Sequence, residues 1–298
     1  MNKIRDLLYI DQIHRRNIRG RGINVAVVDT GIYPHNDLRK SIIYFHDFVN
    51  KKNMPYDDNS HGTHVSGIIA GNGAMSRGMY RGMAPDAGII ALKVLNSSGC
   101  EDARTIIKGL EWIMDNYSLY NIRIVNISIG TEASSCDDEL SSLIKAVDSL
   151  WDMGITVITS AGNNGPEYHT ITTPGISRKV ITVGTSDIMI HTDTSGKKHI
   201  TYSSKGPTLC DVQKPDIIAP GNNIVSCFTK QGGYTSKSGT SMSTPIVSGA
   251  AALVMSYNPS ISNNEFKELL CRSADDAGLD RYTQGCGRLN VSKLLLLC

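Results

Sequence analysis

Aromatic side chains, an excess of charge of either sign and long apolar runs are all scarce in this sequence. Phe, Trp and Tyr make up 6% of the 298 residues, whereas there are 28 glycines. This balance favours an α/β protein with tight turns over a β-sandwich. The 30 Lys and Arg residues nearly match the 28 Asp and Glu residues, so nothing indicates nucleic acid or an acidic surface as a partner.

Segments that would direct the chain to or through a membrane are also missing. The apolar stretch at 294–297 is far too short to cross a bilayer, and the first residues contain no sustained apolar segment of the signal-peptide kind. The seven cysteines form no C-x-x-C pair and show no histidine spacing typical of zinc. Reduced thiols, a cytoplasmic location and no membrane association are therefore the expectation.

Buried strands and amphipathic helices alternate along the chain, and no linker divides it. Apolar, β-branched runs predict strands within 23–31, 88–95, 122–130, 155–165, 179–187 and 214–221. Apolar residues at helical spacing predict helices at 61–72, 103–116, 139–154, 236–255 and 263–274. We expect one domain over residues 1–298, with 1–22 as a lead-in segment. Its predicted fold is a three-layer α/β/α sandwich with a mainly parallel central sheet.

The segment SKSGTSMSTPIVSGAAALVM, residues 236–255, places several hydroxyl groups at the start of a predicted helix. One interpretation is an ordinary capped helix, because Ser and Thr are preferred caps and Pro245 suits the first turn. The other is a nucleophile, because the N-terminus of a helix favours the negative charge that forms during acyl transfer. The residues of this segment leave both open.

Polar side chains at predicted strand ends favour the second interpretation. Asp29 ends the first strand and Asn163 follows a later one, and in open parallel sheets sites form at the carboxyl ends of strands. A hydrolase of this type needs a hydroxyl, an imidazole, a carboxylate and a donor to the oxyanion. Ser241, His61, Asp29 and Asn163 are candidates for these four groups. The spacing does not choose between His61 and His64.

Four motifs carry a resemblance to a known family. The segments VAVVDTGI, NSHGTHVSGIIAG, SAGNNG and SGTSMSTPIVSGAAAL resemble, in order, the signature blocks of the subtilisin-like serine proteases, or subtilases. The segments YRGMAP, KVLNSSG and TITTPGISRKVITVG are most similar to the intracellular AprX-like subtilases. The similarity extends from about residue 10 to about residue 291.

The resemblance implies a serine endopeptidase that acts through an acyl-enzyme. Asp29 would orient the general base His61, Ser241 would be the nucleophile, and Asn163 would stabilise the oxyanion beside the backbone N–H of Ser241. His64 would have a packing role. The alternatives are a non-catalytic peptide-binding or regulatory homologue, and a hydrolase that acts on esters. No triad residue is missing, which argues against the first.

The resemblance also implies how a polypeptide substrate is bound. Substrate backbone would pair with two edges, and a primary pocket would take the side chain before the cleaved bond. The edge residues are Ser98, Gly99, Ser128, Ile129 and Gly130, the pocket residues are Ala161 and Gly162, and Asn164 and Thr172 lie at its rim or floor. Because neither of the last two is acidic, a medium to large apolar side chain is expected. Asp57 and Asp58 either favour a basic residue in the substrate or form a solvated turn.

No cofactor is expected for the chemistry, whereas structural calcium is left open. Asp37 matches a family position in a tight calcium site, but Arg77 and Arg81 in the adjoining segment argue against a cation there. The carbonyls of Pro174 and Ile176, with Asp216, resemble a weaker family site, and oxygen ligands suit calcium. The alternative is a buried turn with a hydrogen-bonded Asp216.

Maturation and assembly complete the expectations. The segment IDQIHRRNIRGRGINVAVVDTG resembles the family's mature start, so expression from Met1 in a reducing cytosol is expected to give active enzyme without processing. The sequence contains no indication of the oligomeric state.

Overall fold

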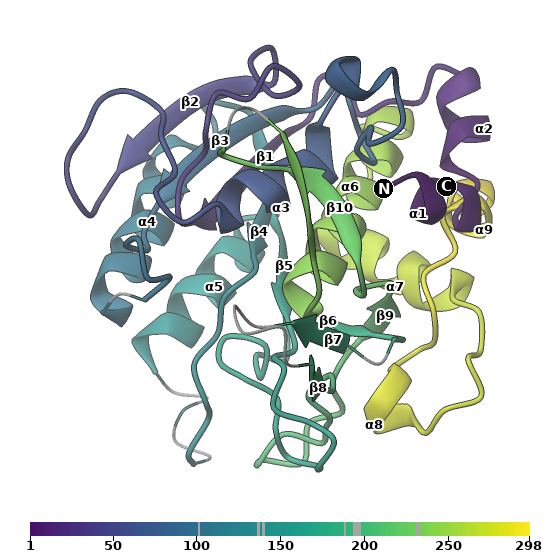
Figure 1. Cartoon of the computed structure of the whole chain (residues 1–298). Helices are drawn as coiled ribbons and strands as arrows, with labels where there is room; N and C mark the ends of the chain where they lie inside the picture. The colour runs from purple at the N-terminus through teal and green to yellow at the C-terminus, as the bar shows by residue number, and fades with distance from the viewer. Residues whose placement is uncertain (101, 136–137, 139–140, 188, 193–197, 231–232) are drawn as a thin grey trace.

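A seven-stranded parallel sheet forms the centre of the protein (Figure 1). The computed structural model describes residues 1–298 except 101, 136–137, 139–140, 188, 193–197 and 231–232. The strand order is β2-β3-β1-β4-β5-β6-β9, and every neighbouring pair is parallel. The strands are β1 (Asn24–Asp29), β2 (Ile42–Asp47), β3 (Gly88–Lys93), β4 (Ile122–Ile127), β5 (Thr156–Ser160), β6 (Ile181–Thr185) and β9 (Ile217–Ala219).

Helices cover both faces of this sheet. On one face α3 (His61–Ala70) packs against α6 (Thr240–Tyr257), and on the other α4 (Ala103–Asn116) packs against α5 (Ser142–Asp152). Near the chain ends lie α1 (Asn2–Leu7), α2 (Ile10–Arg15), α7 (Asn263–Ser273), α8 (Arg281–Gln284) and α9 (Val291–Leu297). The predicted three-layer α/β/α sandwich with a parallel sheet is confirmed.

Burial explains why the central strands were predictable. All six residues of β3 and five of the six in β1 are buried, as expected for strands covered by helices on both faces. The small residues of α6 allow close packing, because a Cβ on Gly249 would lie only 2.4 Å from the Cβ of Met83. The sequences of the central strands are therefore continuous apolar runs.

The structure adds elements that the apolar patterns did not predict. These are the edge strand β2, the short helices α1, α2, α8 and α9, the hairpin of β7 (Met189–Thr192) with β8 (Lys198–Thr201), and that of β10 (Ile224–Cys227) with β11 (Tyr234–Lys237). The lead-in segment packs on the domain. The terminal amine of Met1 donates to the carbonyl of Val225 in β10, and Arg5 donates to the carbonyls of Met79 and Arg81. Among the described residues, no helix is both long and apolar enough to cross a membrane.

The expectation of reduced cysteines is wrong. Cys271 in α7 is bonded to Cys286, 15 residues later, and Cys210 is disulfide-bonded as well. Free thiols are described at Cys100, Cys227 and Cys298. The prediction failed because it looked for closely spaced pairs, whereas the fold brings residues together that are distant in sequence.

Breaking the 271–286 bond should destabilise the protein. Closing a loop of this length contributes about 3 kcal/mol to the free energy of unfolding. Cys271→Ser with Cys286→Ser should therefore lower this free energy by about 2–4 kcal/mol in urea unfolding. Cys100→Ser, at an exposed free thiol, is the matched control and should change little. Equal stability of the double variant and the parent would contradict the prediction.

Candidate active site

Asp29 and His61 are hydrogen-bonded to each other. His61 Nδ1 lies 2.8 and 2.9 Å from the two carboxylate oxygens of Asp29. Asp29 ends β1 and is fully buried, and His61 begins α3. Because the carboxylate holds the proton on Nδ1, Nε2 is the nitrogen free to accept another.

A glycine makes this approach possible. A Cβ on Gly62 would lie 2.2 Å from the carbonyl oxygen of Gly31, so a larger residue would push the start of α3 away from the end of β1. The hydroxyl of Thr30 accepts the backbone N–H of Gly62 at 2.9 Å. The D-T-G segment at the end of β1 therefore packs directly against the H-G-T-H segment at the start of α3.

Asp57 organises the turn that precedes His61. Its buried carboxylate accepts the Thr30 hydroxyl, the backbone N–H groups of Asn59, Ser60 and Thr63, and the Thr63 hydroxyl at 2.6–3.0 Å. Burial alone would raise the pKa of Asp57, but these hydrogen bonds outweigh it and hold the pKa below its usual value. This carboxylate serves the fold and does not face a substrate.

The carboxylate of Asp58 also has a partner within the protein. The fully buried Lys93 donates to Asp58 at 2.7 Å and to the carbonyls of Thr30 and Leu95 at 2.7 and 2.8 Å. Asp57 is buried, so neither interpretation applies to it, whereas Asp58 is exposed and paired with Lys93, and both interpretations stay open for that residue.

Ser241 lies in the first turn of α6, on the same side of the sheet as His61. Its hydroxyl donates to the carbonyl of Ser128 at 2.8 Å. Among the described residues the His61 ring is hydrogen-bonded to Asp29, and the Ser241 hydroxyl is directed at the Ser128 carbonyl, so transfer of the Ser241 proton to His61 requires the hydroxyl to rotate. Such contacts are often formed only when substrate binds.

Asn163 is oriented by the same helix terminus. Its side-chain oxygen accepts the backbone N–H and the hydroxyl of Thr240 at 3.0 and 3.1 Å. These two hydrogen bonds show which atom of the Asn163 amide is the oxygen. The amide N–H₂ therefore points away from Thr240 and remains available as a donor. Asn163 and Ser241 line one cleft.

The cleft has a volume of about 510 Å³ and contains most of the predicted residues. Its lining includes His61, Asn163, Ser241, Ser98, Gly99, Ser128, Ile129, Gly130, Gly162, Asn164 and Thr172. Ala161 does not line it, because this residue is fully buried in a small apolar cluster with Ile171 and Ile176. Sequence reasoning missed further lining residues, namely Thr30, Asn59, Leu95, Glu132, Ser160 and Thr240.

Two glycines and one threonine shape the pocket within this cleft. A Cβ on Gly130 would lie 2.4 Å from Thr172 Oγ1, and one on Gly162 would lie 2.5 Å from Thr172 Cγ2. Gly162 also has a φ of 102°, a conformation that favours glycine. Thr172 thus lies close to both walls, and the absence of a Cβ on each glycine is what allows this approach.

His64 is a structural residue. It is fully buried, and its Nε2 lies 2.9 and 3.1 Å from the carbonyls of Ile224 and Thr235. Burial lowers its pKa to about 3, so the ring stays neutral. The structure therefore distinguishes the two histidines that sequence spacing did not: His61 contacts Asp29, whereas His64 joins α3 to the β10–β11 hairpin.

The residues of the weaker predicted calcium site do not fit a divalent cation. The Asp216 carboxylate contacts Lys214 Nζ at 2.6 Å, Lys267 Nζ at 3.1 Å and the backbone N–H of Thr182 at 2.7 Å. Lys267 also donates to the carbonyls of residues 178–180 at 2.9–3.2 Å. Two ammonium groups occupy the carboxylate, so a further cation beside it would be repelled.

In this cluster, burial and the neighbouring charges shift the pKa values in opposite directions. Burial lowers the pKa of Lys214 to about 8, although the adjacent Asp216 opposes the shift. Burial would raise the pKa of Asp216, but Lys214 and Lys267 outweigh it and lower the pKa. Pro174 and Ile176, the other predicted ligands, lie near the small apolar cluster and the cleft wall, and Ile176 is buried.

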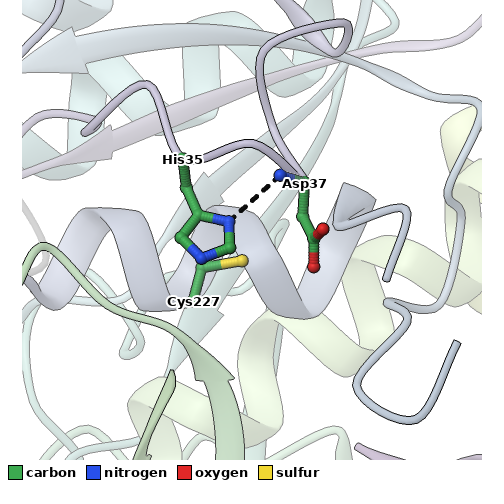
Figure 2. A group of neighbouring side chains, drawn as sticks. All are labelled: His35, Asp37 and Cys227. Carbon is green, nitrogen blue, oxygen red and sulfur yellow. Dashed lines mark hydrogen bonds between the residues drawn. The ribbon is translucent and has the colours of Figure 1, made fainter. Parts of the chain in front are cut away.

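Asp37, which matches the position of the tight family site where no cation was expected, belongs to a second buried group. Figure 2 shows it beside His35 and Cys227, with possible ligand atoms within 4.8 Å of one another. However, His35 Nδ1 accepts the backbone N–H of Asp37 at 3.1 Å, so the proton of the neutral ring is on Nε2. Burial raises the pKa of the Cys227 thiol. The two carboxylate oxygens of Asp37 already accept the backbone N–H of Met75 at 2.9 Å and the hydroxyl of Tyr234 at 2.6 Å, so we assign no metal to this group.

Comparisons with known proteins agree with this geometry. The model of the subtilase family matches residues 20–288. The serine protease AprX of Bacillus subtilis is 44% identical over 295 residues, a match that covers 93% of this chain and 66% of AprX. This chain thus spans slightly under two thirds of the length of AprX. Subtilisin DY of Bacillus licheniformis is 33% identical over 288 residues, which cover 96% of this chain and 95% of that protein.

Solved structures show the same fold. Sphericase superposes with a TM-score of 0.76 at 31% identity, over 91% of this chain and 92% of the other. The S41 psychrophilic protease superposes with a TM-score of 0.77 at 32% identity, again over 91% and 92%.

The ammonium cluster at Asp216 leads to a prediction about metal dependence. Asp216→Asn should lower the free energy of unfolding by about 3–5 kcal/mol, because the buried ammonium group of Lys214 and the partly buried one of Lys267 lose their counter-charge. Calcium or a chelator should leave the melting temperature of the parent unchanged at this site. Scanning calorimetry of parent and variant with and without calcium checks this. A calcium-dependent melting temperature that Asp216→Asn abolishes would contradict it.

Proposed function

Because the chain belongs to the subtilase family of serine endopeptidases, we propose that it cleaves peptide bonds through Ser241, His61 and Asp29. The observation that carries the proposal is the Asp29–His61 hydrogen bond beside Ser241 in one cleft, with Ser241 in the first turn of a long helix. The proposed reaction forms an acyl-enzyme on Ser241.

In this reaction, Ser241 first turns its hydroxyl from the Ser128 carbonyl toward His61. Nε2 accepts the proton as the oxygen attacks the substrate carbonyl, and Asp29 stabilises the imidazolium. His61 then gives the proton to the leaving amine, and the C–N bond breaks. A water molecule repeats the sequence: His61 takes its proton, the hydroxide attacks the ester, and the proton returns to Ser241.

The oxyanion is assigned to two donors. The backbone N–H of Ser241 lies at the N-terminus of α6, where the helix dipole favours negative charge. The amide of Asn163 is held by Thr240 with its N–H₂ directed away from that residue. Both donors are in place before substrate binds, which is the condition for strong stabilisation of a transition state.

The substrate is proposed to be an extended polypeptide. Residues 98–99 and 128–130 both line the cleft, where backbone groups can pair with a substrate strand. Gly162 and Thr172 offer a pocket without a charge of their own, which supports medium to large apolar side chains before the cleaved bond. A non-catalytic peptide-binding role is the alternative, and loss of peptidase activity in Ser241→Ala would exclude it.

The cytoplasm is retained as the proposed location of the protein. Three free cysteines are described, but the Cys271–Cys286 bond is typical of an oxidising compartment. Alkylation of thiols in intact cells before lysis tests this: a cytoplasmic protein should be labelled at Cys271 and Cys286. No cofactor is proposed for the chemistry.

Truncation of the proposed triad should be non-additive. Ser241→Ala and His61→Ala should each lower peptidase kcat by several orders of magnitude while the protein stays folded. The double variant should be hardly worse than either single one, because both remove the same unit. Peptide hydrolysis and circular dichroism of all three variants check this. Strictly additive losses would count against a coupled triad.

Asn163→Ala should act on turnover. We expect kcat to fall about 10²- to 10³-fold, the loss found when such a donor is removed from a subtilisin, with KM nearly unchanged. The amide helps mainly as the carbonyl oxygen becomes an anion, so substrate binding is little affected. Steady-state kinetics on one peptide separates the two. A raised KM with unaltered kcat would show that Asn163 binds the ground state instead.

A further inference from the structure

Glu132 is the one carboxylate side chain among the described residues that line the cleft. The other side chain there that can carry charge is His61, which is paired with Asp29. Glu132 is exposed, and Thr172 lies in the same lining. The cleft therefore contains a negative group that the proposed chemistry does not use.

The backbone on either side holds this carboxylate in place. Thr131 and Thr173 exchange backbone hydrogen bonds at 3.0 and 2.8 Å, and so attach the residue before Glu132 to the residue after Thr172. Asn164 donates weakly to Glu132 at 3.5 Å, and the backbone N–H of Asn164 is bonded to Ser204 at 3.1 Å. Glu132 thus stands beside the threonine that lies close to both pocket walls.

The same pair borders a second cavity of about 280 Å³. Glu132 and Asn164 line it together with His169, Thr170 and Ile171. Because they line both cavities, Glu132 and Asn164 form part of the partition between them. A long side chain that enters the pocket from the cleft can therefore place its end near Glu132.

No basic side chain of the described residues forms an ion pair with Glu132. The lysines that form ion pairs among the described residues contact other carboxylates; examples are Lys179 with Asp152 and Lys93 with Asp58. The Asn164 amide is a neutral partner at long distance. The negative charge of Glu132 is thus left for a ligand.

We propose that Glu132 lets the primary pocket also accept Lys or Arg at P1, the substrate residue on the N-terminal side of the cleaved bond. This inference rests on the proposed peptidase function. The aliphatic stem of such a residue lies along Gly162 and Thr172, and its cationic end reaches Glu132 at the rim, as long basic side chains bury their stems and keep the charged end in water. The same walls accept apolar side chains, so the apolar specificity is extended and not replaced.

The experiment uses peptides that differ only at P1, with Lys, Arg, Leu or Phe, and mass spectrometry to confirm the cleaved bond. Glu132→Gln should lower kcat/KM on the Lys and Arg peptides about 2- to 5-fold, the range of an exposed ion pair, and leave Leu and Phe peptides unchanged. Glu132→Lys should lower it further. Added salt should reduce the advantage of the basic peptides in the parent and have no such effect in Glu132→Gln.

Glu167→Gln is the matched control, because Glu167 is exposed on the loop that follows Asn164 and does not line the cleft. It should leave all four peptides unaffected. Equal losses on all peptides in Glu132→Gln, or no loss on the basic ones, would overturn the proposal.

Failure of the proposed function gives a different result. If the parent cleaves none of the peptides, the peptidase assignment is wrong, and Glu132 is then tested by binding. Fluorescence titration of Ser241→Ala with the Lys and Leu peptides should show tighter binding of the Lys peptide, and this difference should vanish when Glu132→Gln is added. Its persistence would overturn the inference about Glu132.

Discussion

A carboxylate outside the triad, Asp57, joins the segments that carry Asp29 and His61. It accepts the Thr30 hydroxyl next to Asp29 and backbone N–H groups in the first turn of α3. A buried carboxylate with fewer partners would be costly, so these bonds keep the turn in one conformation. The Asp29–His61 contact depends on that turn, and the cleft beside Ser241 depends on the contact.

The ends of the strands bring the remaining groups to this point. Ser128 follows β4 and Asn163 follows β5, both at the edge where β1 ends in Asp29. α6 then supplies Ser241 and orients Asn163 through Thr240. Each functional side chain is therefore placed by a different element, and the parallel sheet is what brings these elements into register.

Sequence reasoning predicted the parts of the molecule that repeat a simple pattern. β3 is buried throughout, so its apolar run is unmistakable, and the apolar residues of α4 recur at helical spacing from 103 to 116. The edge strand β2 was missed because its residues alternate between buried and partly exposed and include His46 and Asp47. Ala161 was misplaced because its side chain is buried in the interior between Ser160 and Gly162, which both line the cleft.

Side-chain partners from distant segments left no trace in the sequence. Asp216 reads like a calcium ligand until Lys267 is found beside it, 51 residues later along the chain. Cys271 and Cys286 form no recognisable pair, and Glu132 follows the predicted substrate edge by only two residues, yet nothing local indicates that it lines the cleft. Such pairings are properties of the packed fold.

The ammonium cluster at Asp216 changes what the stability of the protein responds to. A bound ion stabilises in proportion to the logarithm of its concentration and can be diluted away, whereas a lysine is part of the chain and is always present. The contribution of this cluster to stability then varies with pH. Because burial holds the pKa of Lys214 near 8, below the value of 10.5 in an unfolded chain, the unfolded state binds more protons between these limits. Through Lys214 alone, the free energy of unfolding therefore rises as the pH increases across this interval.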